Sequence, residues 1–179
     1  MRTKLITLIL FLSATILCNA QTKKGSYMVG GYGNADFTTS YAFKTVISPN
    51  IGYFLADGFA LGGGPILGLQ SGTYNSYIGG LNLFSRYYIG LSPSVQLFGQ
   101  VQGNFIYTHH KTRRKYPISE DILPTNSFVG TFGGGLGVAY FITEQVSLEA
   151  LFRYDRNNNR KSKNIFTLDF GFQIYFPRQ

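Results

Sequence analysis

The residues with the greatest chemical capacity are four charged side chains in segments that otherwise alternate apolar and small neutral residues: Arg86, Glu149, Arg153 and Asp169. Neighbouring carboxylates could act as a general acid and base. If the last two segments pair as a hairpin whose residue numbers sum to about 320, Asp169 lies opposite Leu151 and one diagonal step from Arg153. Because buried charges persist only when they are paired, we interpret the four as a structural ion-pair network rather than a catalytic dyad.

A second group of reactive side chains lies in one long polar segment, where His109 and His110 could act as a base near Ser119, Glu120 or Asp121. Catalysis needs a nucleophile and a base at fixed geometry, and this segment offers no ordering partner on a neighbouring element. Adjacent histidines on an extended segment point to opposite sides and are a poor chelating pair. The sequence therefore predicts no catalytic residues, no metal and no cofactor.

The composition is typical of one folded domain that is rich in apolar side chains. The chain has 179 residues, 16% aromatic and 13% charged, with a formal net charge of +8. This excludes a disordered chain, which is highly charged and poor in aromatic residues. No stretch after residue 17 approaches 18 consecutive apolar residues, which excludes a bundle of membrane helices. Glycine runs such as 62–64 and 133–135 open no helix, so they predict no nucleotide site.

The first 20 residues have the pattern of a cleaved secretory signal peptide. Arg2 and Lys4 precede an apolar stretch over 5–17, and small residues follow at 18–20, which is the order found in such signals. The mature chain would then be a single domain over 21–179. Its only cysteine, Cys18, would be removed with the signal, so no disulfide is predicted.

The mature chain is predicted to consist of β-strands from end to end. The clearest evidence is at 166–176, where six large apolar residues alternate without exception with five others, a period of two that indicates a strand. The predicted strands are eight: 25–37, 42–55, 59–70, 77–90, 95–108, 127–142, 146–155 and 164–176. Tight connections at 56–58, 91–94 and 143–145 alternate with longer polar ones around 38–41, 71–76, 109–126 and 156–163. This pattern predicts an all-β fold, an eight-stranded antiparallel up-and-down transmembrane β-barrel.

The two faces of the strands distinguish a membrane barrel from a soluble one. One face carries Phe, Leu, Ile and Val, and the other carries mainly Gly, Gln, Asn, Ser and Thr. Small neutral residues suit the narrow lumen of eight strands, so the apolar face would meet lipid. A secreted soluble barrel that binds a small apolar ligand is the alternative. A pore is disfavoured, because the lumen would be filled by large inward side chains: Phe84, Arg86, Phe98, Gln100 and Gln102.

Two hairpin segments carry a resemblance to a known family. Residues 47–63 (ISPNIGYFLADGFALGG) and 132–149 (FGGGLGVAYFITEQVSLE) resemble the strand, tight turn, strand units of the outer-membrane β-barrel family of Gram-negative bacteria. In architecture the chain is similar to outer-membrane protein X and to the barrel domain of outer-membrane protein A. The resemblance implies an outer-membrane location and insertion by the barrel-insertion machinery. One departure is that Pro177, Arg178 and Gln179 follow Phe176, whereas many such barrels end on the aromatic residue.

Basic residues are concentrated in two of the long connections. Removal of Arg2 and Lys4 leaves 14 of the 16 Lys and Arg, and eight of these 14 lie in two clusters. The basic clusters are Lys111, Arg113, Arg114 and Lys115 in the first, and Arg156, Arg160, Lys161 and Lys163 in the second. Both belong to the same rim, which in an outer membrane faces anionic lipopolysaccharide. The expected partners are therefore membrane lipid and lipopolysaccharide, with no nucleic acid, and we expect a monomer.

These observations leave two classes of function. The first is a non-enzymatic outer-membrane barrel that presents basic surface loops and has a structural or interaction role in the cell envelope. The second is an outer-membrane enzyme that modifies lipids through the histidine segment. The absence of an ordered nucleophile and base favours the first.

Overall fold

The computed structural model describes residues 22–39, 42–71, 75–111, 126–157 and 165–178. The predicted signal peptide over 1–20 lies outside these residues, as do the larger parts of the two basic clusters. Within the described residues no helix is long and apolar enough to cross a membrane.

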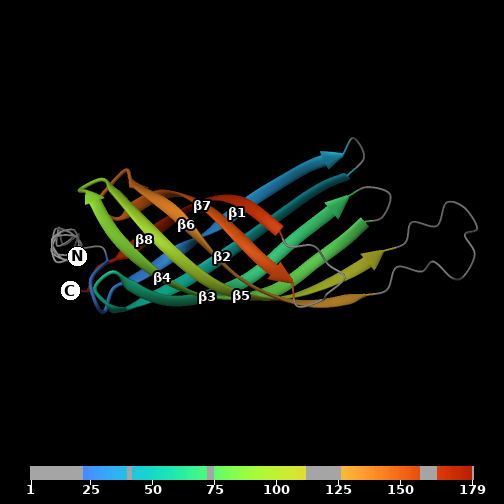
Figure 1. Ribbon diagram of the computed structural model, residues 1–179, viewed down its shortest axis with the longest axis horizontal. Helices are drawn as coiled ribbons and strands as arrows, with labels where there is room; N and C mark the ends of the chain where they lie inside the picture. Colours follow the sequence, from blue (N-terminus) through green and yellow to red (C-terminus); the bar gives the residue numbers. More distant parts are fainter. Residues whose placement is uncertain (1–21, 40–41, 72–74, 112–125, 158–164, 179) are drawn as a thin grey trace, which may run out of the picture.

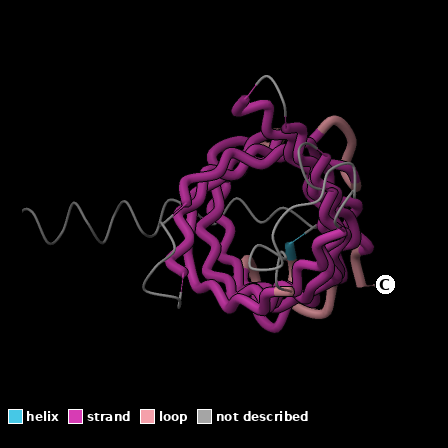
Figure 2. The backbone as a smooth tube through the Cα atoms, turned by 90° about the vertical axis from the view of Figure 1, so that its right-hand side faces the viewer, coloured by secondary structure: helices cyan, strands magenta, loops and turns pink. Residues whose placement is uncertain are grey.

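Eight antiparallel strands close into a barrel in which each strand pairs with the next and β1 pairs with β8 (Figures 1 and 2). The strands are β1 (Tyr27–Thr39), β2 (Ala42–Ala56), β3 (Phe59–Ser71), β4 (Asn75–Ser92), β5 (Val95–Lys111), β6 (Ser127–Phe141), β7 (Val146–Asn157) and β8 (Ile165–Phe176). The predicted fold, strand number and antiparallel order are confirmed. The register of the last hairpin also agrees with the sequence, because Leu151 lies opposite Asp169.

Several strands extend beyond their predicted ends at the rim of the longer connections. β4 begins at Asn75, and β5 continues to Lys111, because these two residues still pair in the ladder. The connections expected over 38–41 and 71–76 shrink to 40–41 and 72–74 for the same reason. The prediction that Lys111 and Arg156 belong to loops was therefore wrong, since both lie near the ends of strands.

The opposite rim is closed by tight turns and by the N-terminal segment. At the turn between β2 and β3, Gly58 adopts a φ of +74°, a left-handed conformation that glycine adopts without a steric penalty. The amide of Gly58 donates to the carbonyl of Thr22 over 2.7 Å, and the amide of Gly25 donates to the carbonyl of Phe54 over 2.8 Å. Residues before β1 are thereby tied across this rim, where the chain also leaves β8 (Figure 1).

The outer surface of the barrel is apolar. Most large hydrophobic side chains at outward positions are 37% to 75% exposed. Among the charged strand side chains that the structure describes, only Arg156 takes an outward position, opposite Phe132 near the end of β7. A closed barrel satisfies its backbone hydrogen bonds without an edge, so such a surface can face hydrocarbon.

Exposed tyrosines border this apolar surface at both rims. Tyr27, Tyr53, Tyr87 and Tyr140 lie toward the tight-turn rim, and Tyr77 and Tyr107 lie toward the other. On β4, Tyr77 and Tyr87 are 87 − 77 = 10 residues apart. At ~3.3 Å per residue and a tilt of ~40°, this corresponds to roughly 25 Å along the barrel axis, the height of the apolar band in outer-membrane barrels.

Candidate functional site

The lumen is the part of the molecule where polar and charged side chains converge. Its tight-turn half is filled by buried apolar and aromatic residues: Met28, Phe54, Ala60, Phe84, Tyr88, Phe98, Ala139, Phe141, Leu151 and Tyr175. Packing is close, because a Cβ on Gly137 would lie only 2.2 Å from Cζ of Phe98. Side chains therefore occupy this half of the barrel, as the narrow lumen of eight strands requires.

A fully buried ion pair lies directly above this apolar plug. Arg86 on β4 and Glu149 on β7 face each other across the lumen, with 3.0 Å between Nη1 and Oε2 and no exposed side-chain surface on either. Three tyrosine hydroxyls donate to the Glu149 carboxylate, from Tyr32, from Tyr88 over 3.4 Å and from Tyr175 over 2.9 Å. The carboxylate is thereby held from β1, β4 and β8 as well as from its own strand.

The Arg86 guanidinium is also surrounded by partners. Its Nε and Nη2 both donate to Oε1 of Gln100, over 2.9 and 2.6 Å. Its Cζ lies 4.4 Å from the centre of the Phe98 ring and 5.1 Å from that of Phe84, within the range of cation–π attraction. A buried charge pair is stable only when its remaining donors and acceptors are satisfied, and these contacts satisfy that condition.

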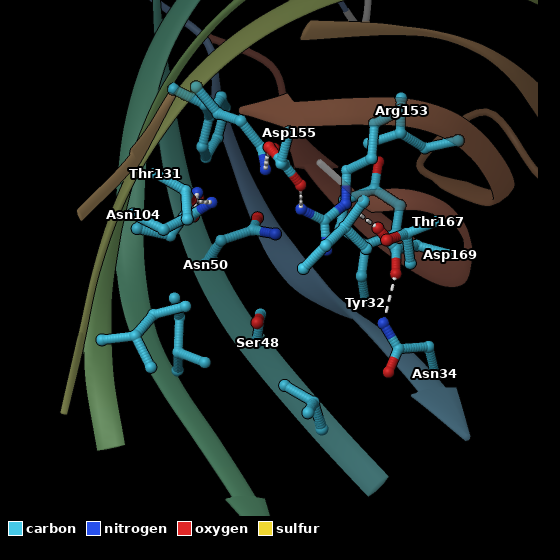
Figure 3. A pocket seen from close by; sticks show the side chains of 18 of the residues that line it. Tyr32, Asn34, Ser48, Asn50, Asn104, Thr131, Arg153, Asp155, Thr167 and Asp169 are labelled. Carbon is cyan, nitrogen blue, oxygen red and sulfur yellow. Dashed lines mark hydrogen bonds and ion pairs between the residues drawn. The ribbon is translucent and has the colours of Figure 1, made fainter. Parts of the chain in front are cut away.

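A relay of two glutamines joins this ion pair to a second charged cluster nearer the long-loop rim. Gln100 donates to Gln102 over 2.6 Å, and Gln102 donates to Oδ1 of Asp155 over 3.2 Å. Arg153 forms ion pairs with both Asp155 and Asp169. The four predicted residues thus belong to one connected set of contacts that runs along the barrel axis (Figure 3 shows its upper part).

The second cluster borders a cavity of about 200 Å³ in the upper half of the lumen. The Arg86 and Phe84 side chains form its floor, and Lys44, Thr108 and Ile165 lie toward its mouth. Asn34 on β1 donates to Oδ1 of Asp169 over 2.7 Å at the cavity wall (Figure 3). The cavity is a pocket with a closed floor, because the plug fills the lumen beneath it.

The contacts also include residues for which the sequence analysis predicts no such role. Asp155 is not among the four residues of the predicted network, although it shares the inward face with Arg153 two positions earlier. The hydroxyls of Tyr32, Tyr88 and Tyr175 were not predicted to bind Glu149. The available signal was parity, because Tyr88 alternates in phase with Arg86, and Tyr175 alternates in phase with Asp169.

The remaining candidates are only partly described. His109 is exposed, and its Nδ1 lies 2.9 Å from Oδ1 of Asn126. Ser119, Glu120 and Asp121 fall outside the described residues, as do six of the eight residues of the basic clusters: Arg113, Arg114, Lys115, Arg160, Lys161 and Lys163. Among the described side chains no group of three or more His, Cys, Asp or Glu could hold a metal ion.

Comparison with known proteins identifies the fold through structure alone. No protein-family model and no curated protein matches the chain. It is similar to the outer membrane protein OprG from Pseudomonas aeruginosa, with 13% identity and a TM-score of 0.58, covering 89% of this chain and 99% of that one. The N-terminal β-barrel domain of Pseudomonas aeruginosa OprF is 18% identical, with a TM-score of 0.56, and the match covers 86% of this chain and 98% of that one. Neisserial surface protein A is 16% identical, with a TM-score of 0.54, and the match covers 83% of this chain and 94% of that one. At these low identities the comparison shows the fold alone. It confirms the predicted resemblance to small eight-stranded outer-membrane barrels at that level.

Proposed function

We propose that this chain is an integral outer-membrane barrel without enzymatic activity, exported by a signal peptide over 1–20 and inserted as a single barrel domain over 21–179. The observation that carries the proposal is the apolar outer surface, bordered by exposed tyrosines at both rims. The structures that the chain resembles include outer-membrane proteins, which supports the same location. In this account the barrel-insertion machinery receives β8 as the last strand.

The distribution of polar groups opposes the alternative of a secreted carrier of apolar ligands. Such a barrel would place its apolar side chains in the lumen and its charges outside. Here the described charged side chains of the strands point inward with the single exception of Arg156, whereas residues such as Leu136 and Phe128 are 75% and 70% exposed on the outside. Lipid is the environment in which this arrangement is stable.

The arrangement of the lumen favours a structural role over catalysis. The carboxylates of Glu149, Asp155 and Asp169 all accept hydrogen bonds or ion pairs from neighbouring side chains. The hydroxyls of Ser147, Tyr32, Tyr88 and Tyr175 all donate to Glu149. The charge of this carboxylate is already paired with Arg86, which favours a structural carboxylate over a base that activates a nucleophile. We infer that the charges hold the barrel together from inside.

The interaction role that we propose is contact between the basic clusters and lipopolysaccharide at the long-loop rim. Arg156, the one cluster member with a described side chain, is exposed at that rim, beside the outward Phe132. Each basic residue near an anionic lipid surface contributes about 1 kcal/mol, and the clusters together hold eight such residues.

Neutralising both basic clusters to glutamine should weaken binding to lipopolysaccharide vesicles more than tenfold at low salt. The difference should shrink as salt screens charges beyond a Debye length of ~8 Å. The measurement is vesicle binding by the refolded barrel at several salt concentrations. The matched control neutralises Lys23, Lys24 and Arg178 at the opposite rim, which should leave binding unchanged. Equal binding by the cluster variant and the parent at low salt would reduce the clusters to solubilising surface.

A further inference from the structure

The cavity in the upper lumen has the size of a ligand site. Its volume of about 200 Å³ is well above the ~30 Å³ that one water occupies in the liquid. It lies between the ion-paired floor at Arg86 and the long-loop rim, so a small molecule can reach it only from that rim. Neither the stabilising role of the lumen charges nor lipopolysaccharide contact requires this space.

The charged groups deep in the cavity do not balance one another. One guanidinium, that of Arg153, serves two carboxylates, those of Asp155 and Asp169. These two aspartates are only 5% and 4% exposed. The ion pair at the floor of the cavity, between Arg86 and Glu149, has one charge of each sign and is balanced by itself. One negative charge is therefore left over in a buried place, where an uncompensated charge is costly.

The other basic group that lines the cavity does not remove this excess. Lys44 lies toward the mouth and is exposed, so water screens its charge from the aspartates below. Its position leaves the deep part of the cavity attractive to a second cation.

A separate observation at the same cavity indicates a missing partner. The Asn50 side chain projects from β2 toward the aspartates (Figure 3). It is 9% exposed, and its Oδ1 accepts no hydrogen bond from any described residue. An unsatisfied buried acceptor is uncommon in folded proteins. It adds an acceptor without a donor to a cavity whose two carboxylates accept from Arg153, Gln102 and Asn34 but together carry one negative charge more than Arg153 balances.

The wall nearer the mouth is apolar. Four consecutive strands, β2 to β5, contribute one branched aliphatic side chain each, Val46, Ile66, Ile78 and Ile106. On each of β2, β4 and β5 this residue lies closer to the long-loop rim than the cavity-lining asparagine of the same strand, respectively Asn50, Asn82 and Asn104. On these three strands the apolar side chains therefore lie nearer the rim than the asparagine acceptors.

We propose that this cavity binds a small amphiphilic amine, with its ammonium group between Asp155, Asp169 and the Asn50 amide and its alkyl part against Val46, Ile66, Ile78 and Ile106. The ammonium supplies the positive charge that would balance the two aspartates and a donor for Oδ1 of Asn50. The aliphatic wall gives affinity for the alkyl part. This inference depends on the lumen alone and is independent of the basic clusters.

The test is a titration of the refolded barrel in zwitterionic nanodiscs with n-butylammonium chloride, in a phosphate buffer free of other amines. Backbone amide shifts in the nuclear magnetic resonance spectrum should localise binding to Asn50, Asp155 and Asp169. The uncharged isostere 1-butanol should bind at least tenfold more weakly, because it lacks a charge-assisted hydrogen bond to the carboxylates. Methylammonium should also bind more weakly, by about fourfold for each methylene lost from the apolar wall.

Asp155→Asn keeps the shape of the side chain and removes the excess charge, so it should weaken butylammonium binding more than tenfold. Glu144→Gln removes an exposed carboxylate at the tight-turn rim and should change the affinity less than twofold. Three results would overturn the proposal: no localised shifts, equal binding of 1-butanol and butylammonium, or displacement of butylammonium by equimolar sodium chloride. The last result would assign the site to an inorganic cation.

Discussion

The Glu149→Gln variant is expected to lose about 3 to 5 kcal/mol of unfolding free energy, the usual consequence of removing one partner from a buried ion pair. Tyr32 donates to Oε2 and Tyr175 to Oε1, so glutamine keeps the shape of the side chain and one of the two acceptor oxygens while it removes the charge. What remains is the Arg86 guanidinium, 1% exposed in the middle of the lumen, without its counter-ion. The measurement is reversible urea unfolding of the barrel in lipid vesicles.

A second substitution separates loss of charge balance from loss of packing. Adding Arg86→Leu to Glu149→Gln removes the unpaired charge, so the double variant should recover most of the lost unfolding free energy, as replacement of both partners by neutral groups often does. If the single variant is as stable as the parent, or if the double variant is no more stable than the single one, the ion pair is not what holds the lumen together.

Leu168→Arg is expected to cost about 2 to 4 kcal/mol of unfolding free energy, the cost of a basic residue at the lipid-facing midplane of a barrel. Leu168 is 51% exposed on the outer surface of β8, between the outward side chains of Phe166 and Phe170. In the lipid account all of this exposed area meets hydrocarbon, where a guanidinium loses its hydration. Urea unfolding in vesicles measures the effect.

Thr167→Arg is the matched control, because it places the same side chain one position earlier and on the other face. Thr167 pairs with Arg153 in the ladder and lines the lumen cavity, where Asp155 and Asp169 can compensate an added positive charge. We expect this variant to be far less destabilised than Leu168→Arg. Equal losses of unfolding free energy would show that the two faces of β8 are assigned wrongly.

The faces of the strands were predictable because lipid and lumen impose opposite demands at alternate positions. Along β8 the alternation has no exception. Where β6 leads into β7, the tight turn at 143–145 fixes the register of these two strands, so that Phe141 lies opposite Ser147. There Oγ1 of Thr143 accepts hydrogen bonds from the amides of Gln145 and Val146, over 3.2 and 3.0 Å. The register of two strands joined by a tight turn thus depends on local turn residues, which can be recognised in the sequence.

Contacts across the lumen were less accessible from sequence. Arg86 and Glu149 lie on strands that are not neighbours, so their meeting depends on strand tilt and on the stagger of the closed barrel, which no local pattern records. The glutamine relay and the cavity at Asn50 have the same origin. Inward parity identified the residues available to the lumen, but the partner of each one required the three-dimensional arrangement.

Membrane fractionation of cells that express the full chain tests the central claim most directly. An integral outer-membrane barrel should appear in the outer-membrane fraction in a form shortened by cleavage after residue 20, resist extraction by alkaline carbonate, and dissolve only in detergent. The apolar outer surface, with side chains such as Phe170 and Phe172 more than half exposed, predicts this behaviour. Recovery of the protein as a soluble periplasmic species, with no need for detergent, would contradict the account.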